Sequence, residues 1–145
     1  MKLSRTVTTQ APIADVFGYL ADFTTTTEWD PGTLSTTRVC GDGGVGTRYR
    51  NVSRFLGRET ELTYVVQQVE LGSLLRLRGE NRTVVATDTM TFREAQGGGT
   101  TVTYHAAFSF RGVARLVAPL LAPAFRRLGD DAQAGLRTAL GRLAA

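Results

Sequence analysis

The last third of the chain, residues 112–145, limits most strongly what this sequence can fold into. Apolar side chains recur there every three or four residues, as on one face of an α-helix. These positions are Val113, Leu116, Val117, Leu120, Leu121, Phe125, Leu128, Ala132, Leu136, Leu140 and Leu143. Because a helix of this length needs a large apolar surface beneath it, we predict that it packs on one face of a curved antiparallel sheet.

Two prolines interrupt this helical pattern. Pro119 and Pro123 each lack a backbone donor, and each clashes with the preceding turn. We therefore expect a short irregular segment over 115–121 and a regular helix from about Pro123, since proline is tolerated in a first turn. A kink here would leave a gap between helix and sheet, which is where we expect a cavity.

Most of the chain before this helix has the alternation and turn boundaries of β-strands. The predicted strands span residues 2–9, 33–40, 47–56, 59–69, 74–80, 83–94 and 100–110. From the second strand on, the connections are short, so these strands should pair as successive antiparallel hairpins. After the first strand, residues 12–22 predict a short helix, and residues 22–30 predict a second short helix or a turn. Residues 1–145 are expected to form a single α+β domain.

The composition argues against several classes of site. The single cysteine, Cys40, excludes a disulfide framework and a multi-cysteine metal site. The glycine runs at 41–46 and 97–99 lie between strands and not between a strand and a helix, so they predict hairpin turns and not phosphate-binding loops. We expect neither a metal nor a cofactor.

Charge and hydropathy restrict the expected partners and location. The net charge is +4, but the arginines are scattered and interrupted by acids, so we expect no nucleic acid partner. No segment approaches the roughly 20 apolar residues of a membrane span, and the N-terminus lacks an apolar signal-peptide core. The expectation is a cytoplasmic protein without stable membrane insertion.

The strand face that should lie under the helix contains polar as well as apolar residues. The polar ones are Tyr49, Asn51, Tyr64, Asp88 and Tyr104. An unpartnered buried polar group costs about 1–3 kcal/mol, so five on one concave surface favour a wetted cavity or a hydrogen-bond network. In the alternative interpretation, the tyrosine hydroxyls reach the rim and the Asn and Asp side chains pair with arginines.

Three of these residues are candidates for catalysis. An inward-facing Asp88 carboxyl would be desolvated and its pKa raised, as a general acid requires, unless it forms a salt bridge with an arginine. Tyr64 and Tyr104 share its side of the sheet and could assist it. His105 is the only histidine, and alternation places it on the opposite side from Tyr104.

Trp29, the only tryptophan, could be a lid residue that contacts a ligand or a plug that anchors a small helix to the sheet. The residues expected to line the cavity and bind a ligand are Trp29, Tyr49, Asn51, Phe55, Tyr64, Leu77, Met90, Tyr104, Phe108, Leu116, Leu120 and Phe125.

Several stretches resemble one known superfamily. They are VGTRYR, TELTYVVQQVELGSLLRLRGE, GGGTTVTYHAAFSFRG and RLVAPLLAPAFRRLGDDAQAGLRTAL, and the opening TVTTQAPIADVFGYLADFTTTTEWDP agrees. Together they resemble the START/polyketide-cyclase-like (SRPBCC, Bet v 1-like) superfamily over essentially the whole chain. The resemblance implies a helix-grip fold, in which a seven-stranded antiparallel sheet wraps a long C-terminal helix around a hydrophobic cavity.

The resemblance does not select one function, because this superfamily spans carriers, aromatase/cyclases and stress-response proteins. Our leading hypothesis is that the cavity binds a small hydrophobic molecule such as a lipid, polyketide or isoprenoid. The alternatives are a polyketide cyclase/dehydratase-type enzyme that uses no metal, and a protein-interaction module with a vestigial cavity. Both a monomer and a homodimer are compatible with the sequence.

Overall fold

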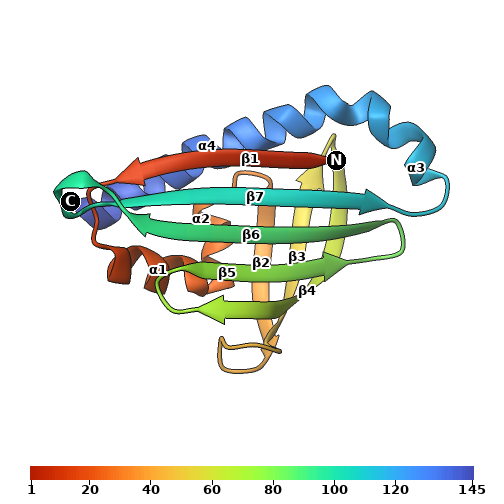
Figure 1. Ribbon diagram of the computed structural model, residues 1–145. Helices are drawn as coiled ribbons and strands as arrows, with labels where there is room; N and C mark the ends of the chain where they lie inside the picture. Colours follow the sequence, from red (N-terminus) through yellow and green to blue (C-terminus); the bar gives the residue numbers. More distant parts are fainter.

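The computed structural model describes residues 1–145 and shows one strongly curved antiparallel sheet with a long helix across its concave face (Figure 1). The strands lie in the order β1-β7-β6-β5-β4-β3-β2. Their bounds are β1 Lys2–Thr9, β2 Thr33–Cys40, β3 Arg48–Phe55, β4 Arg58–Glu70, β5 Leu74–Glu80, β6 Val84–Glu94 and β7 Thr100–Phe110. This is the helix-grip fold, and the predicted fold class is confirmed.

The order of the strands follows from the lengths of the connections. From β2 to β7 each strand pairs with the next one in the chain, as short turns require. Strand β1 instead pairs with β7, from Lys2 opposite Ala107 to Thr9 opposite Thr100. The two helices between β1 and β2 allow the chain to cross from one edge of the sheet to the other.

The C-terminal helix is interrupted where the prolines predict. Helix α3 (Ala114–Val117) is followed by the 3-10 turn η3 (Ala118–Leu121) and then by the regular helix α4 (Ala122–Ala144). Pro119 lies within η3 and Pro123 in the first turn of α4. The regular helix buries one stripe against the sheet and the small helices, which contains Phe125, Gly129, Ala132, Leu136, Ala139 and Leu140.

Three residues of the predicted helix face do not pack on the sheet. Val113, Leu116 and Leu120 are 82%, 80% and 77% exposed, so this part of the prediction is wrong. The residues of this segment that line the pocket instead are Ala114, Ala118 and Leu121, on the opposite side of the segment.

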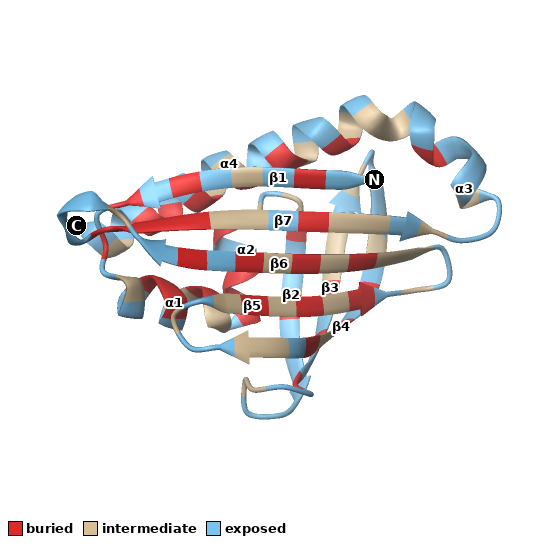
Figure 2. Ribbon diagram, in the orientation of Figure 1, coloured by how far each residue is buried: buried red, intermediate tan, exposed pale blue.

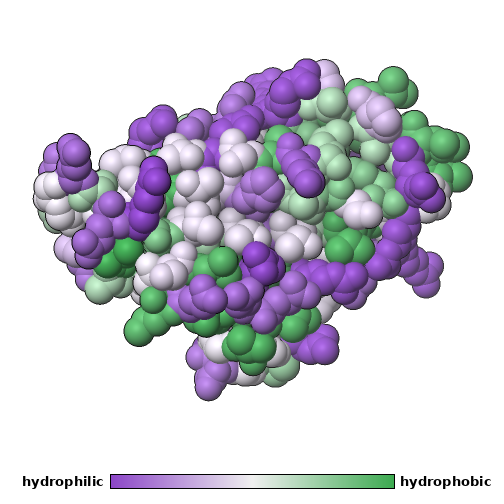
Figure 3. All heavy atoms as spheres, in the orientation of Figure 1, coloured by the Kyte–Doolittle hydropathy of each residue, from purple (hydrophilic) through white to green (hydrophobic).

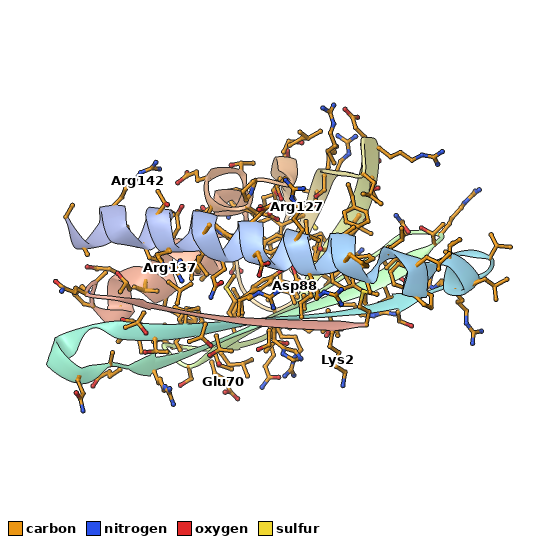
Figure 4. All side chains as sticks on the ribbon, turned by 90° about the horizontal axis from the view of Figure 1, so that it is seen from above. Lys2, Glu70, Asp88, Arg127, Arg137 and Arg142 are labelled. Atoms are coloured by element: carbon orange, nitrogen blue, oxygen red, sulfur yellow. The ribbon has the colours of Figure 1, made fainter.

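The alternation predicted for the strands is confirmed (Figure 2). Asp88 and Met90 on β6 face the helix, as do Tyr64 on β4 and Leu77 on β5, and all four are buried. On the opposite face of the sheet, Lys2 and Glu70 point away from α4 (Figure 4). His105 is exposed on this outer face, as expected.

Three short helical elements close one end of the concave face. Helix α1 (Ile13–Ala21) buries Val16, Phe17 and Leu20. The 3-10 turn η1 (Phe23–Thr25) and helix α2 (Thr26–Trp29) follow it, and α2 packs against both β2 and α4. None of the helices is long and apolar enough to cross a membrane.

The β3–β4 turn contains a residue in a conformation that its side chain disfavours. Leu56 has φ 53° and Gly57 has φ 78°, so both central residues are left-handed, and Leu56 is 61% exposed. We expect Leu56→Asn to raise the free energy of unfolding by roughly 0.5–1 kcal/mol, because asparagine tolerates this conformation. Urea denaturation measures the change.

The matched control for this substitution is Leu71→Asn. Leu71 is also exposed and lies in the β4–β5 turn, but it has a negative φ. It should change the free energy of unfolding by less than about 0.5 kcal/mol. An equal effect of the two substitutions would contradict backbone strain at Leu56.

Candidate functional site

A pocket of about 330 Å³ lies between the concave face of the sheet and the C-terminal helical segment. Fifteen of its 25 lining residues are hydrophobic. These hydrophobic residues come from η1 and α2, from strands β3, β4, β6 and β7, and from α3, η3 and α4. The pocket therefore exists only in the folded chain. The irregular segment of α3 and η3 that the prolines predict contributes four of its lining residues, Ala114, Val117, Ala118 and Leu121.

Phe125 closes the pocket beneath the first turn of α4. Its ring centroid is 4.7 Å from that of Phe55 on β3 and 5.0 Å from that of Phe108 on β7. Phe110, at the end of β7, adds a third aromatic contact at 5.6 Å. These contacts join the helix to strands from both halves of the sheet.

The pocket opens to solvent at the α3 end. Three of its lining residues, Arg54, Thr83 and Val117, are themselves exposed. They come from β3, the β5–β6 turn and α3, which surround the opening.

Asp88 is the buried carboxyl of the pocket. It projects from the middle of β6, between its cross-strand neighbours Leu77 and Ala106, and lies between α4 and the sheet (Figure 4). Burial, reinforced by the charge of Asp30, raises its pKa from 3.8 to about 7, although a hydrogen bond with Tyr104 acts in the opposite direction. No arginine or lysine forms a salt bridge with it.

Two tyrosines lie beside Asp88. Burial and the Asp88 charge both raise the pKa of Tyr64 and of Tyr104, so their hydroxyls stay protonated. Tyr64 lies across Gly79, its partner on β5, where a Cβ would be 2.7 Å from the tyrosine ring. The glycine therefore lets the ring lie flat along the sheet.

Trp29 and Asp30 approach the same region from the end of α2. The indole ring of Trp29 packs edge-on against Tyr104, with centroids 5.8 Å apart. Its Nε1–H is buried and has no acceptor in the protein. Asp30 accepts hydrogen bonds from the Gly32 amide at 3.1 Å and the Thr33 hydroxyl at 3.0 Å, yet burial still raises its pKa.

The structure brings most of the sequence-derived candidates to one pocket. All three catalytic candidates, Asp88, Tyr64 and Tyr104, line it. The ligand-binding candidates that also line it are Trp29, Asn51, Phe55, Tyr64, Tyr104, Phe108 and Phe125. Their roles in catalysis and in ligand binding stay predictions.

Asn51 differs from the others because its polar atoms are already engaged. Its amide donates to Thr36 Oγ1 at 2.9 Å, and its carbonyl oxygen accepts from Ser53 Oγ at 2.7 Å. Thr36 in turn is 2.6 Å from Thr26 Oγ1, at the start of α2. Asn51 therefore helps to hold α2 against β2 and β3.

Five expected lining residues lie outside the pocket. Tyr49, Leu77 and Met90 do face the helix, but neighbouring side chains cover them in the solid part of the core, where Phe23 packs on Tyr49. Leu116 and Leu120 lie on the solvent side of α3 and η3. Alternation identifies the face of a strand, but not where along it the packing leaves space.

The sequence reasoning also missed three lining residues of interest. Asp30 follows the singled-out Trp29, and the local signal was the Asx turn typical of Asp-Pro-Gly. Arg54 is exposed, but it also borders the pocket opening. Phe110, at the end of β7, lines the pocket beside Phe125.

The residues offer no evident metal site. No group of three or more His, Cys, Asp or Glu side chains lies together. The chemistry available in the pocket is that of neutral hydrogen-bond donors, two carboxyls with raised pKa values (Asp88 and Asp30), the Arg54 guanidinium at the opening and an apolar wall.

Comparison with solved structures supports the fold. The Zhui aromatase/cyclase from Streptomyces sp. R1128 superimposes with a TM-score of 0.82 at 14% identity, covering 97% of this chain and 93% of that one. A START superfamily protein from Mycobacterium smegmatis superimposes with a TM-score of 0.75 at 12% identity, covering 99% of this chain and 96% of that one. Ara h 8.0201 superimposes with a TM-score of 0.63 at 14% identity, covering 95% of this chain and 98% of that one.

Comparison of the sequence with family models identifies the family of this chain. No curated protein matches the chain. The family model described as "Polyketide cyclase / dehydrase and lipid transport" matches residues 1–145, that is, the whole chain. The chain therefore belongs to the polyketide cyclase/dehydrase and lipid transport family.

Proposed function

We propose that this protein binds a small hydrophobic molecule in the pocket between the sheet and the C-terminal helix. The observation that carries the proposal is the pocket itself, which has a volume of about 330 Å³ and mostly hydrophobic lining residues. Ligand pockets in proteins combine such an apolar wall with a few convergent polar groups. The family and the solved relatives are compatible with this role.

The polar groups indicate which ligands fit. Trp29 contributes a buried indole N–H without an acceptor, and Tyr64 and Tyr104 contribute protonated hydroxyls. Asp88 can also donate a hydrogen bond below pH 7, where it is mostly protonated. The preferred ligand is therefore an apolar molecule with an oxygen acceptor, such as a ketone, ester or phenol.

A second candidate function is a cyclisation or dehydration reaction on such a ligand. A carboxyl with a pKa near 7 can both give and take a proton at neutral pH, as general acid–base catalysis requires. Asp88 would transfer the proton, while Tyr64 and Tyr104 would hold the substrate oxygen. The titratable groups converge on one part of the pocket, which favours this candidate over a purely apolar carrier.

Native mass spectrometry of the purified protein, followed by denaturing extraction, tests the binding proposal first. We expect a defined bound molecule, or a rise in melting temperature with members of a panel of fatty acids, isoprenoid alcohols and aromatic polyketides. An empty protein with no shift across the panel would contradict the proposal.

A substitution that fills the pocket should weaken binding of a hydrophobic probe. Ala118 is 7% exposed and lines the pocket, so Ala118→Phe should weaken binding of N-phenyl-1-naphthylamine by at least about tenfold. The matched control is Leu120→Phe, because Leu120 lies in the same turn but is 77% exposed. Fluorescence titration measures both affinities, and equal affinities would show that the probe binds elsewhere.

Asp88→Asn separates the two candidate functions. A carrier should keep its affinity for the extracted ligand to within a few-fold, since asparagine preserves the shape of the side chain. An enzyme that uses Asp88 as its acid should bind the same ligand but lose turnover. Binding by calorimetry and product formation by mass spectrometry measure the two properties separately.

A further inference from the structure

The end of the molecule that carries α3 exposes a cluster of large aliphatic side chains. Val113, Leu116, Val117 and Leu120 are 82%, 80%, 50% and 77% exposed. We call these four residues the α3 patch. Figure 3 shows hydrophobic side chains gathered at this end (right), with hydrophilic ones at its border.

Apart from the half-exposed Val117, the side chains of the α3 patch are not the ones that α3 and η3 turn toward the sheet. The inner side of the same segment is occupied by Ala114, Ala118 and Leu121, which line the pocket. The segment is therefore apolar on its outer side as well as its inner side, whereas the outer side of α4 carries charged residues such as Arg137 (Figure 4). An apolar outer face at the surface of a protein marks an interaction site.

The chain segment that carries the α3 patch is cationic. Between Glu94 and Asp130 the chain has no acidic residue, but it has four arginines. Arg111 pairs with Glu80 at 2.9 Å. The side chains of Arg115, Arg126 and Arg127 form no salt bridge within the protein, and they lie within about two helical turns of the patch.

We propose that the α3 patch docks the protein onto the surface of an anionic lipid bilayer. Valine and leucine side chains that protrude from a helical tip can enter the acyl-chain boundary, while the flanking arginines contact lipid phosphates. Protein–protein interfaces are instead enriched in aromatic residues and methionine, and the patch contains neither. The aliphatic composition of the patch and the three arginines without a salt bridge together favour a membrane over a protein partner.

The patch adjoins the opening of the pocket. Val117 belongs to both, since it lines the pocket and is half exposed. Docking through the patch would bring the opening to the lipid surface, where an apolar ligand could exchange without crossing water. The exchange rests on the proposed ligand-binding function, but the docking does not.

Flotation with liposomes tests the docking. We expect the protein to float with phosphatidylcholine vesicles that contain about 30 mol% phosphatidylglycerol and to release at about 1 M salt, where charge attraction is screened. Leu116→Glu should weaken this binding by at least about tenfold, and Arg115→Gln should weaken it by several-fold.

The matched control is Leu71→Glu. Leu71 is 89% exposed, and its β4–β5 turn lies at the other end of the sheet from α3 (Figure 1). This variant should float like the unmodified protein. Equal flotation of all variants, or none of the unmodified protein, would overturn the proposal.

Two further measurements distinguish other outcomes. Light scattering tests whether the protein forms a dimer that Leu116→Glu dissociates. If the unmodified protein forms this dimer and does not float with vesicles, a second copy of the chain covers the patch. That result would overturn membrane docking. N-phenyl-1-naphthylamine binding by Leu116→Glu in solution should equal that of the unmodified protein. Loss of flotation with retained probe binding therefore separates failure of docking from failure of the pocket.

Discussion

Gly135→Ala is expected to lower the free energy of unfolding by about 2–3 kcal/mol, despite the higher helix propensity of alanine. Gly135 lies where α4 crosses α2, and an added Cβ would overlap the carbonyl oxygen of Trp29 and lie 3.0 Å from its carbonyl carbon. The atoms in the way belong to the backbone, so no side-chain rotation relieves the overlap. The end of α2 must then move away from α4, and Trp29 moves with it.

The same helix supplies the control for this substitution. Gly141 also lies in α4, but a Cβ there meets nothing within 4 Å. Gly141→Ala should therefore stabilise the protein by about 0.5–1 kcal/mol. Urea denaturation gives both free energies, and the emission of Trp29, the only tryptophan, should shift to longer wavelength in Gly135→Ala alone. Equal stability of the two variants would disprove the close helix contact.

Asp88→Asn is expected to remove much of the pH dependence of stability between about pH 4 and pH 7. In this range an unfolded chain has released the Asp88 proton, while the folded protein, with a pKa of about 7, still holds it. Because the folded state binds more protons, the free energy of unfolding of the unmodified protein falls as the pH rises through this window. A shift from 3.8 to about 7 corresponds to a few kcal/mol, on the order of 4.

The substitution replaces a group that ionises by one that does not. At pH 4, where Asp88 is neutral in the fold, the variant should be nearly as stable as the unmodified protein. At pH 8 it should be more stable, by an amount on the order of 2–4 kcal/mol. The pKa of Asp30 is also raised, so a smaller slope of the same sign should remain in the variant.

Urea denaturation at a series of pH values measures this effect. The control is Asp15→Asn, which removes an exposed carboxyl in the first turn of α1 and so measures the effect of losing one surface carboxyl. Parallel curves for Asp88→Asn and the unmodified protein would show that Asp88 is not buried in its neutral form.

The strand pattern was predictable because each inward residue is determined by local alternation. The segments 2–9, 33–40, 74–80 and 100–110 match β1, β2, β5 and β7 residue for residue. The same alternation predicted that Asp88 and Tyr104 share one face of the neighbouring strands β6 and β7, whereas the alternation around Tyr64 on β4 was ambiguous. The irregular start of the C-terminal helix followed from Pro119 and Pro123 alone.

The position of the cavity along that face was not predictable in the same way. Tyr49, Leu77 and Met90 share the face with the pocket residues but are covered by their neighbours. Whether space remains above a given residue depends on the path of α2 and α4. That path depends in turn on long-range contacts such as those of Gly135 with Trp29 and of Phe125 with Phe55.

The sequence by itself thus determined the order of elements, the inward face of each strand and the break in the C-terminal helix, because these depend on residues a few positions apart. Only the tertiary structure decided which inward residues border open space, that Asp88 has no arginine partner and that Leu116 and Leu120 face solvent. Those outcomes depend on how segments that are distant in the chain pack against one another. A local sequence pattern contains no information about that packing.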